Sequence, residues 1–183
     1  NGGNLLNTGP HPLDQVLQLF GEGMPEIKCV MDRANTFGDA EDHVKVLMTS
    51  KDRPTIDLEI SSCAAYSPYT YLVYGTRGGL MASQTEVNWR YFKPEQAPRQ
   101  ALTREPLPGR QYCREKLKWT ERKWTVPRAK AHLFPYMARQ FYTHLYATLT
   151  QGAPLVITPE QVRQQIAVIE ECHRQNPLSR LGA

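Results

Sequence analysis

The sequence contains no apolar run near the roughly 20 residues that a membrane-spanning helix needs. Its first residues, Asn1–Leu6, show neither the basic segment nor the apolar core of a secretory signal. We therefore expect a cytoplasmic protein with no membrane partner. The chain begins without an initiator methionine, so we expect it to be a fragment of a longer polypeptide.

Cysteine pairs at metal-ligand spacing are also missing. The four cysteines are far apart and form neither C-x-x-C nor a cysteine and histidine zinc pattern, which argues against a structural zinc site. We expect free thiols in a reducing compartment, with a disulfide pair as the less favoured alternative. The cysteines are Cys29, Cys63, Cys113 and Cys172.

The sequence has no G-x-G-x-x-G fingerprint, the turn whose backbone amides approach a dinucleotide pyrophosphate. The glycine-rich stretch 75–79 does not serve, because its flanks on both sides have the pattern of strands. We therefore predict no Rossmann domain and no cofactor-binding residue in this chain.

The net charge of +4 is too small to indicate a nucleic-acid partner. Ten basic and three acidic residues lie between Arg99 and Lys130, within a proline-rich stretch at about 93–135. We interpret this stretch as an irregular basic excursion, a solvated connection rather than a polyanion site. Trp119 and Trp124 within it would anchor the loop or, alternatively, stack on bases or sugars.

Periodicity predicts the regular elements. Apolar residues spaced for one helical face follow Pro10 and end at Gly21, so we expect a helix over 10–20. Residues 55–60 and 87–91 alternate in the manner of half-buried strands, and no helical pattern separates the strands between Val44 and Phe92. The sheet should therefore be largely antiparallel. Further strands are expected at 27–31, 44–49, 69–74 and 80–83.

Two helices are predicted near the end of the chain. The first has Met137, Phe141, Leu145 and Leu149 on one face and ends at Gly152. The second begins with Thr158-Pro159-Glu160-Gln161, a capping box followed by proline at the first helical position. Its buried stripe is expected to contain Val162, Ile166 and Ile169.

His11 is the main candidate for chemistry. It lies in the first turn of the predicted helix, and with Asp14 it falls on the face opposite the apolar stripe. The helix dipole favours a neutral imidazole, whereas Asp14 favours the imidazolium, and the sequence leaves this balance open. On spacing alone, a surface or capping role for His11 is the commoner outcome.

A resemblance to a known family favours the chemical role. The stretch Gly2-Gly3-Asn4-Leu5-Leu6-Asn7-Thr8-Gly9-Pro10-His11-Pro12-Leu13-Asp14 resembles the G-G-x-L-x-D-x-G-x-H-x-x-D signature that opens the C-terminal domain of Gfo/Idh/MocA oxidoreductases. The turn at 74–80 is similar to the family's G-T-x-G-x-L hairpin. The segments 141–155 and 158–161 look like its closing pair of helices.

The resemblance implies an α+β fold, with a mixed, mostly antiparallel open sheet and helices packed on one face. It also implies one C-terminal substrate-binding and oligomerisation domain over residues 1–183. His11 would be the catalytic proton-transfer group, and Asn7 and Asp14 would contact the substrate. Asn7 stands where the family usually has Asp, and it cannot supply the negative charge.

The implied function is that of a dehydrogenase domain acting on a sugar, polyol or related hydroxy compound. NAD or NADP would be bound mainly by an N-terminal nucleotide-binding domain outside this chain, so the isolated chain should be inactive. A homo-oligomer would form through the open sheet face. The alternative is a non-catalytic binding or dimerisation module, in which Asn7 marks the loss of chemistry.

Other candidate sites carry less weight. The cluster at Asp39, Glu41, Asp42 and His43 has residue types that bind metals, but we interpret it as a solvated turn and predict no metal site. His132, His144 and His173 have no partners at ligand spacing, and we expect structural roles for them.

Overall fold

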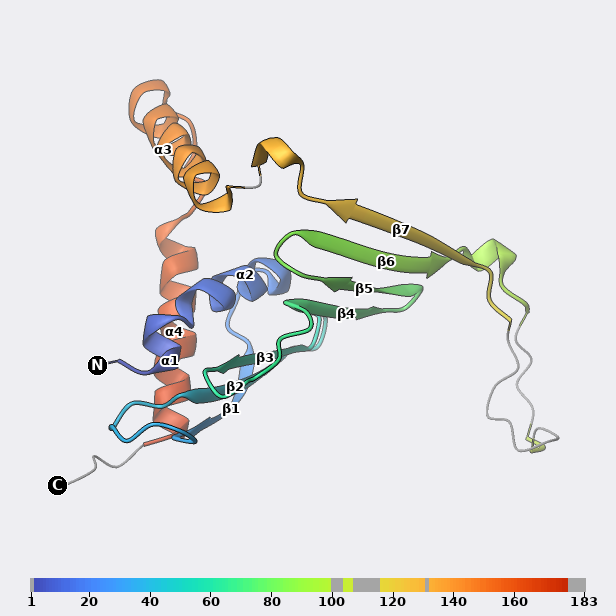
Figure 1. Ribbon diagram of the computed structural model, residues 1–183, viewed down its shortest axis with the longest axis horizontal. Helices are drawn as coiled ribbons and strands as arrows, with labels where there is room; N and C mark the ends of the chain where they lie inside the picture. The colour runs from blue at the N-terminus through green and yellow to red at the C-terminus, as the bar shows by residue number, and fades with distance from the viewer. Residues whose placement is uncertain (1, 100–103, 107–115, 131, 178–183) are drawn as a thin grey trace. The chain divides into compact units, whose positions relative to one another are not determined.

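The computed structural model describes residues 2–99, 104–106, 116–130 and 132–177 (Figure 1). The chain divides into two compact units, one built from residues 1–65 and 143–183 and the other from residues 66–142. The boundary falls inside the helix α3 (Leu133–Gln151).

The first unit contains a three-stranded antiparallel sheet in the order β1-β2-β3. Its other complete elements are three helices, two that precede the sheet in sequence and one near the chain's end, and it also contains the end of α3. The elements are α1 (Asn4–Asn7), α2 (Pro10–Phe20), β1 (Glu26–Asp32), β2 (His43–Thr49), β3 (Ile56–Ser61) and α4 (Pro159–Gln175).

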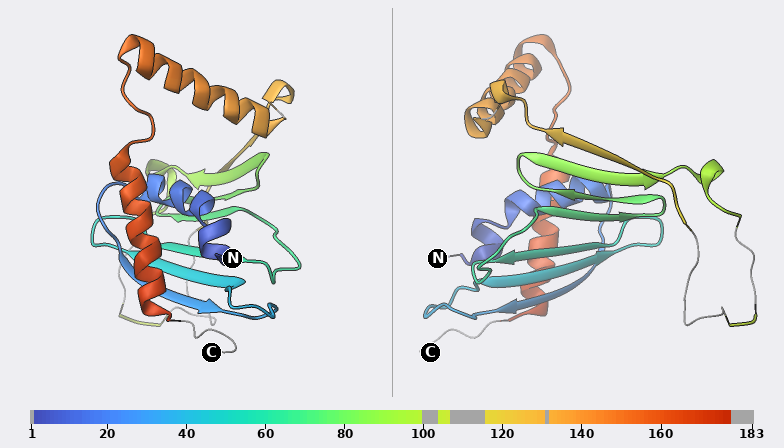
Figure 2. Two further views of the ribbon diagram at one scale, coloured as in Figure 1. Left: turned by 90° about the vertical axis from the view of Figure 1, so that its left-hand side faces the viewer. Right: turned by 45° about the vertical axis from the view of Figure 1, so that its right-hand side comes forward.

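The core of this unit lies between one face of the sheet and the helices. Side chains alternate strictly between buried and exposed along β1, as expected for a sheet with one covered face. Figure 2 shows α2 and α4 on the same face of the sheet, and α2 contacts β3 while α4 contacts β1. The opposite face carries Lys45, which pairs with Asp57 and Glu59 at 3.3 Å each.

The helix α2 has the predicted bounds, and its apolar stripe is buried. The short helix α1 before it was not predicted. Asn7 ends α1 and does not cap α2. Gly9 occupies the N-cap position of α2 and has no side chain to offer.

The helix α4 has the predicted capping box. The Thr158 N–H donates to Gln161 Oε1 at 2.8 Å, and the Gln161 N–H donates to Thr158 Oγ1 at 3.3 Å. Its buried face differs from the prediction, because Val162 and Ile166 are both 46% exposed. The core contacts come from the second half of the helix, through Val168, Ile169 and Cys172.

Two amide side chains at the end of α4 cover the free edge of β1. Gln175 accepts from the Cys29 N–H at 2.8 Å and donates to the Ile27 carbonyl at 2.8 Å. Asn176 accepts from the Met31 N–H at 3.1 Å and donates to the Cys29 carbonyl at 3.0 Å. Side chains thus supply the ladder hydrogen bonds that a further strand would make, and they protect an otherwise open edge.

The second unit contains a four-stranded antiparallel sheet in the order β4-β5-β6-β7. The predicted hairpin is present, with Thr76 and Arg77 between the first two strands. Gly78 is required there because a β-carbon would overlap the backbone of Arg90 and Tyr91 on the next strand. The strands are β4 (Tyr71–Gly75), β5 (Gly78–Ala82), β6 (Glu86–Phe92) and β7 (Trp119–Thr125).

The predicted excursion at 93–135 contains more regular structure than the sequence indicates. The strand β7 lies inside it and pairs with β6 over seven residues. The short 3-10 helices η1 (Pro94–Gln96) and η2 (Arg128–Lys130) also fall within it. The sequence Trp119-Thr120-Glu121-Arg122-Lys123-Trp124-Thr125 has no apolar alternation, so periodicity could not reveal this strand.

The α+β fold class is confirmed, with strand pairing that is antiparallel throughout the described residues. These strands form two sheets rather than the single open sheet that was expected.

Within the described chain, no helix is both long enough and apolar enough to cross a bilayer. None of the side chains of α3 is buried, and its predicted apolar face at Met137 and Phe141 is exposed.

The described cysteines are free thiols, and Cys113 lies outside the described residues. Cys29 on β1 and Cys172 on α4 are both buried in the core of the first unit. The hydrogen-bond contact with Cys29, together with burial, raises the pKa of the Cys172 thiol.

Candidate functional site

The segment that resembles the family signature forms a tight corner between α1 and α2. The N–H groups of Thr8 and Gly9 both donate to the Asn4 carbonyl, at 3.1 and 2.7 Å. Gly9 is buried, and a β-carbon on it would overlap the Leu5 carbonyl. The glycine is therefore needed so that two backbone segments can approach closely. This approach sets where α2 begins, and with it the position of His11.

The start of this segment is held by Glu41, which is 5% exposed. The Asn4 N–H donates to the Glu41 backbone carbonyl at 2.9 Å, and the Leu5 N–H donates to Glu41 Oε1 at 3.0 Å. The N-cap residue of α1, Gly3, makes no side-chain cap. Glu41 therefore satisfies two of the first N–H groups of α1, one through its backbone carbonyl and one through its carboxylate.

Asn4 ties the same segment to two loops of the sheet. Its Nδ2 donates to the Asp42 carbonyl at 2.7 Å and to Ser62 Oγ at 2.9 Å, and Ser62 Oγ donates to Asn4 Oδ1 at 3.1 Å. Each polar atom of the amide thus has a partner, which fixes the orientation of α1 over the end of the sheet.

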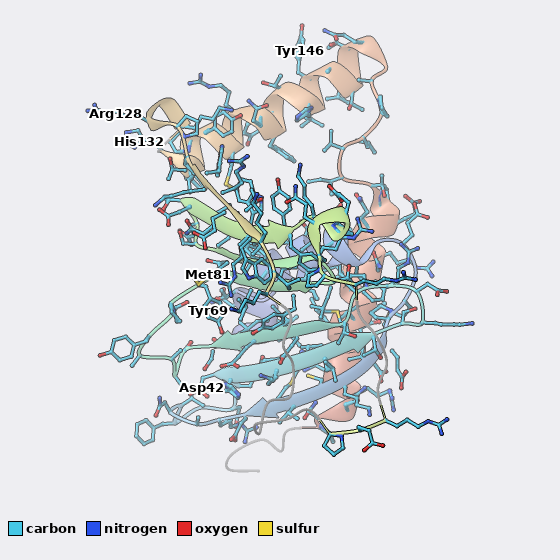
Figure 3. The ribbon with its side chains drawn as sticks, turned by 90° about the vertical axis from the view of Figure 1, so that its right-hand side faces the viewer. Asp42, Tyr69, Met81, Arg128, His132 and Tyr146 are labelled. Carbon is cyan, nitrogen blue, oxygen red and sulfur yellow. The ribbon has the colours of Figure 1, made fainter. Side chains whose placement is uncertain are left out.

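Asp42 orders the loop that follows β1. Its two carboxylate oxygens accept from the N–H groups of Ala34 and Asn35, at 2.7 Å each. Burial would raise the pKa of Asp42, but donation by the backbone N–H groups of Asn35 and Ala34 outweighs it and holds the pKa below its usual value. Figure 3 shows Asp42 where this loop enters β2.

The interpretation of residues 39–43 as a solvated turn was therefore wrong for its two central members. Glu41 and Asp42 are buried because their carboxylates accept hydrogen bonds from backbone N–H groups. No group of three or more His, Cys, Asp or Glu residues in the described part of the chain has a geometry suited to a metal ion.

A polar cleft of about 620 Å³ opens beside this corner. Asn7, one of the predicted substrate-binding residues, lies in its wall together with the carboxylate-bearing residues Glu41 and Asp42. Carboxylate, amide and hydroxyl groups can together bind the hydroxyl groups of a small ligand. The lining residues are Gly2, Gly3, Asn4, Leu6, Asn7, Thr36, Ala40, Glu41 and Asp42.

His11 lies in the first turn of α2 and is exposed, facing away from the core of its unit. Its backbone N–H donates to the Thr8 carbonyl at 3.3 Å, so the backbone hydrogen bonds of the corner extend to His11. Asp14 is half-buried on the same helix. His11 and Asp14 are not among the lining residues of the cleft, and among the described residues no hydrogen bond joins His11 to Asn7 or Asp14.

Sequence reasoning missed Glu41 as a member of this site. The residue types Glu41 and Asp42 directly before a strand were noticed, but their spacing indicates a metal cluster or a turn. Only the fold brings Glu41 against the N-terminus of α1, which is 36 residues away in sequence. No pattern in the sequence signals this contact.

A second cleft, of about 810 Å³, lies on one face of the four-stranded sheet within the second unit. The Trp119 ring lies 4.9 Å from the Arg90 guanidinium and meets the Phe92 ring edge-on at 5.7 Å. Tyr74 and Met81 in its lining are exposed, and Figure 3 places Met81 on this sheet. Trp119 lies on β7 and thus contacts two side chains of the neighbouring strand β6.

The comparisons with known proteins agree with the resemblance. A sequence model described as the GFO/IDH/MocA C-terminal domain matches residues 1–81. None of the curated proteins matches the sequence.

Solved structures match almost the whole chain. An oxidoreductase from Bacillus cereus is 17% identical, with a TM-score of 0.72 over 99% of this chain and 53% of that one. An NAD-binding protein from Listeria innocua is 19% identical, with a TM-score of 0.67 over 98% of this chain and 51% of that one. An oxidoreductase from Agrobacterium radiobacter, solved with NAD+, L-tartaric acid and magnesium, is 15% identical, with a TM-score of 0.64 over 94% of this chain and 46% of that one.

The chain spans about half the length of these structures, and at such identities the likeness concerns the fold. The resemblance that the signature, the hairpin and the closing helices indicated is confirmed. The GFO/IDH/MocA C-terminal domain model thus matches the first 81 residues, and the whole chain has the fold found in oxidoreductases about twice its length.

Proposed function

We propose that this chain is the substrate-binding domain of an NAD(P)-dependent dehydrogenase that acts on a sugar, a polyol or a related hydroxy compound. The observation that supports this most is the signature segment itself. It folds into a glycine-dependent corner that presents His11 to solvent and lines a polar cleft with Asn7. The family match covers this segment.

In this proposal His11 exchanges the proton of the reacting hydroxyl. Imidazole is the side chain that enzymes use most often for proton transfer, and His11 is exposed where a substrate can reach it. Asn7 would orient the substrate through its amide, which both donates and accepts hydrogen bonds. Asp14, one turn after His11, would contribute to substrate binding from the half-buried side of the helix.

A nicotinamide, when bound, supplies only the hydride chemistry of such a reaction. The residues of this chain do not fit it, because the sequence has no glycine fingerprint between a strand and a helix. We therefore assign dinucleotide binding to a separate N-terminal domain, and we expect the isolated chain to be inactive. The roughly twofold length of the matched oxidoreductases supports this division.

The test is an assay of the complete polypeptide with a panel of sugars, polyols and hydroxy acids. Each compound is offered with NAD and with NADP, and the absorbance of the reduced nicotinamide is followed. Substrate-dependent reduction with at least one polyol or sugar supports the proposal. Cofactor binding without turnover of any hydroxy compound counts against it.

Asn7 itself favours a second candidate function. It is exposed at the cleft and carries no charge where the family usually has an acid. A non-catalytic binding or dimerisation module would retain the fold and lose the chemistry in this way. Ligand binding in calorimetry without turnover in the assay above would favour this second candidate.

We also propose that the protein forms a homo-oligomer through an open sheet face. One face of the four-stranded sheet supports this, since the large apolar side chains of Leu72, Tyr74, Met81 and Trp119 are exposed there. Sedimentation of a Tyr74→Glu variant should show a smaller oligomer than the parent protein forms.

Free thiols at the described cysteines suit the cytoplasmic location that we propose.

A further inference from the structure

The polar cleft beside α1 contains a buried carboxylate to which neither the sequence nor the family resemblance assigns a role. Glu41 is 5% exposed, and it lines the cleft together with Asn7. Its Oε1 is occupied by the Leu5 N–H. Its Oε2 lies over Gly3, which is itself a lining residue.

The neighbouring carboxylate has a different task. Both oxygens of Asp42 accept hydrogen bonds from backbone N–H groups of the loop after β1. The Asp42 carboxylate therefore stabilises the loop. Glu41 makes one such bond through its side chain. Glu41 is therefore the carboxylate of the cleft wall with capacity for a ligand, because an ionised carboxylate accepts up to about four hydrogen bonds.

The charge of the cleft follows from this arrangement. Asn7 contributes an amide and Thr36 a hydroxyl, so Glu41 and Asp42 are the charged lining residues. A buried negative group repels a second anion and accepts hydrogen bonds from hydroxyl donors, and bonds to charged acceptors are about twice as strong as neutral ones.

We propose that Glu41 is a substrate-binding and specificity-determining residue, which accepts hydroxyl hydrogen bonds from an uncharged polyhydroxylated substrate and disfavours carboxylate-bearing hydroxy acids. This inference rests on the proposed function and narrows its substrate class to sugars and polyols. The cleft gains from Glu41 the negative charge that Asn7 does not provide. A β-carbon at position 3 would overlap the Glu41 carboxylate, which would then have to shift.

The test is Glu41→Gln in the complete polypeptide. Glutamine keeps an oxygen for the Leu5 N–H, so α1 stays in place while the charge is lost. We expect the KM for the best polyol to rise on the order of 10-fold or more, with a smaller change in kcat. The ratio of kcat/KM between polyol and hydroxy acid should fall.

A matched control is Glu59→Gln, an exposed carboxylate on the opposite face of the three-stranded sheet that pairs with Lys45. It should leave KM and the polyol preference unchanged. If Glu41→Gln has wild-type KM and wild-type preference, the proposal is overturned and Glu41 is a structural cap only.

A second variant covers the case in which Glu41→Gln does not fold. Asn7 is exposed, so Asn7→Asp should fold, and it adds a further negative charge to the cleft that Glu41 and Asp42 already line. The preference for polyols over hydroxy acids should then increase by about threefold or more. An unchanged preference would overturn the assignment of this cleft to the substrate.

The outcome separates this inference from the proposed function. If no hydroxy compound is turned over, polyol binding is measured instead as a rise in the thermal-unfolding midpoint. The tightest-binding polyol is added at about 100 times its Kd. A polyol-induced rise that is lost in Glu41→Gln supports the cleft assignment even though the dehydrogenase proposal has failed. Normal turnover with an unaffected Glu41→Gln leaves the function and removes the inference.

Discussion

Gly3 packs directly against the carboxylate of Glu41, leaving no room for a side chain at position 3. The same carboxylate accepts the Leu5 N–H two residues further on. A glycine of the signature and an acidic residue of a distant loop therefore depend on each other for their positions. Because α1 leads through Gly9 into α2, this contact also fixes the position of His11.

Gly3→Ala should destabilise the protein by about 1–3 kcal/mol, because the new methyl group forces the Glu41 carboxylate out of its position. Urea unfolding of the parent and the variant measures the difference. Gly38→Ala is the control, since a β-carbon there meets only Thr36 Oγ1 at 3.7 Å. Equal losses in the two variants would show that the contact with Glu41 carries no special weight.

Asp42 should contribute to stability in a pH-dependent way. Its folded pKa is depressed, so its contribution is present above the ordinary carboxyl pKa of about 3.9 and is lost as the pH falls through the lower folded value. Asp42→Asn should therefore flatten the decrease in melting temperature between about pH 5 and pH 2. Parallel curves for the two proteins would mean that the loop does not stabilise the ionised form.

Gln175→Ala should expose the edge of β1. The Cys29 N–H and the Ile27 carbonyl lose their partner, at a cost of about 1–3 kcal/mol for the unsatisfied groups. Hydrogen exchange at the Cys29 amide should become faster. Arg163→Ala, an exposed position on the same helix, is the control and should leave that exchange rate unchanged.

The elements that could be predicted are those whose side chains alternate between core and solvent. Leu13, Val16 and Leu17 all face the core, so periodicity alone located α2 at its observed bounds. The strand β7 was missed because its register is set by pairing with β6 and its side chains are mostly polar and exposed. Burial of Val162 and Ile166 was predicted wrongly, since packing selects only part of an apolar face.

The candidate site was predictable only in part. The position of His11 in the first turn of a helix follows from local spacing, and the resemblance supplied the roles of His11 and Asn7. The cleft depends on a contact between residues 36 positions apart, Leu5 and Glu41, and no local pattern encodes it. Non-local carboxylates of this kind are recognised only when the fold has brought them to the helix.

The account depends most on His11 as the proton-transfer group presented by the corner. The most direct measurement is kcat/KM of His11→Ala in the complete polypeptide, with Gln18→Ala, another exposed residue of α2, as the control. The account predicts a decrease of about 100-fold or more for His11→Ala and near-normal activity for the control. Activity within about threefold of the parent protein in His11→Ala would contradict it.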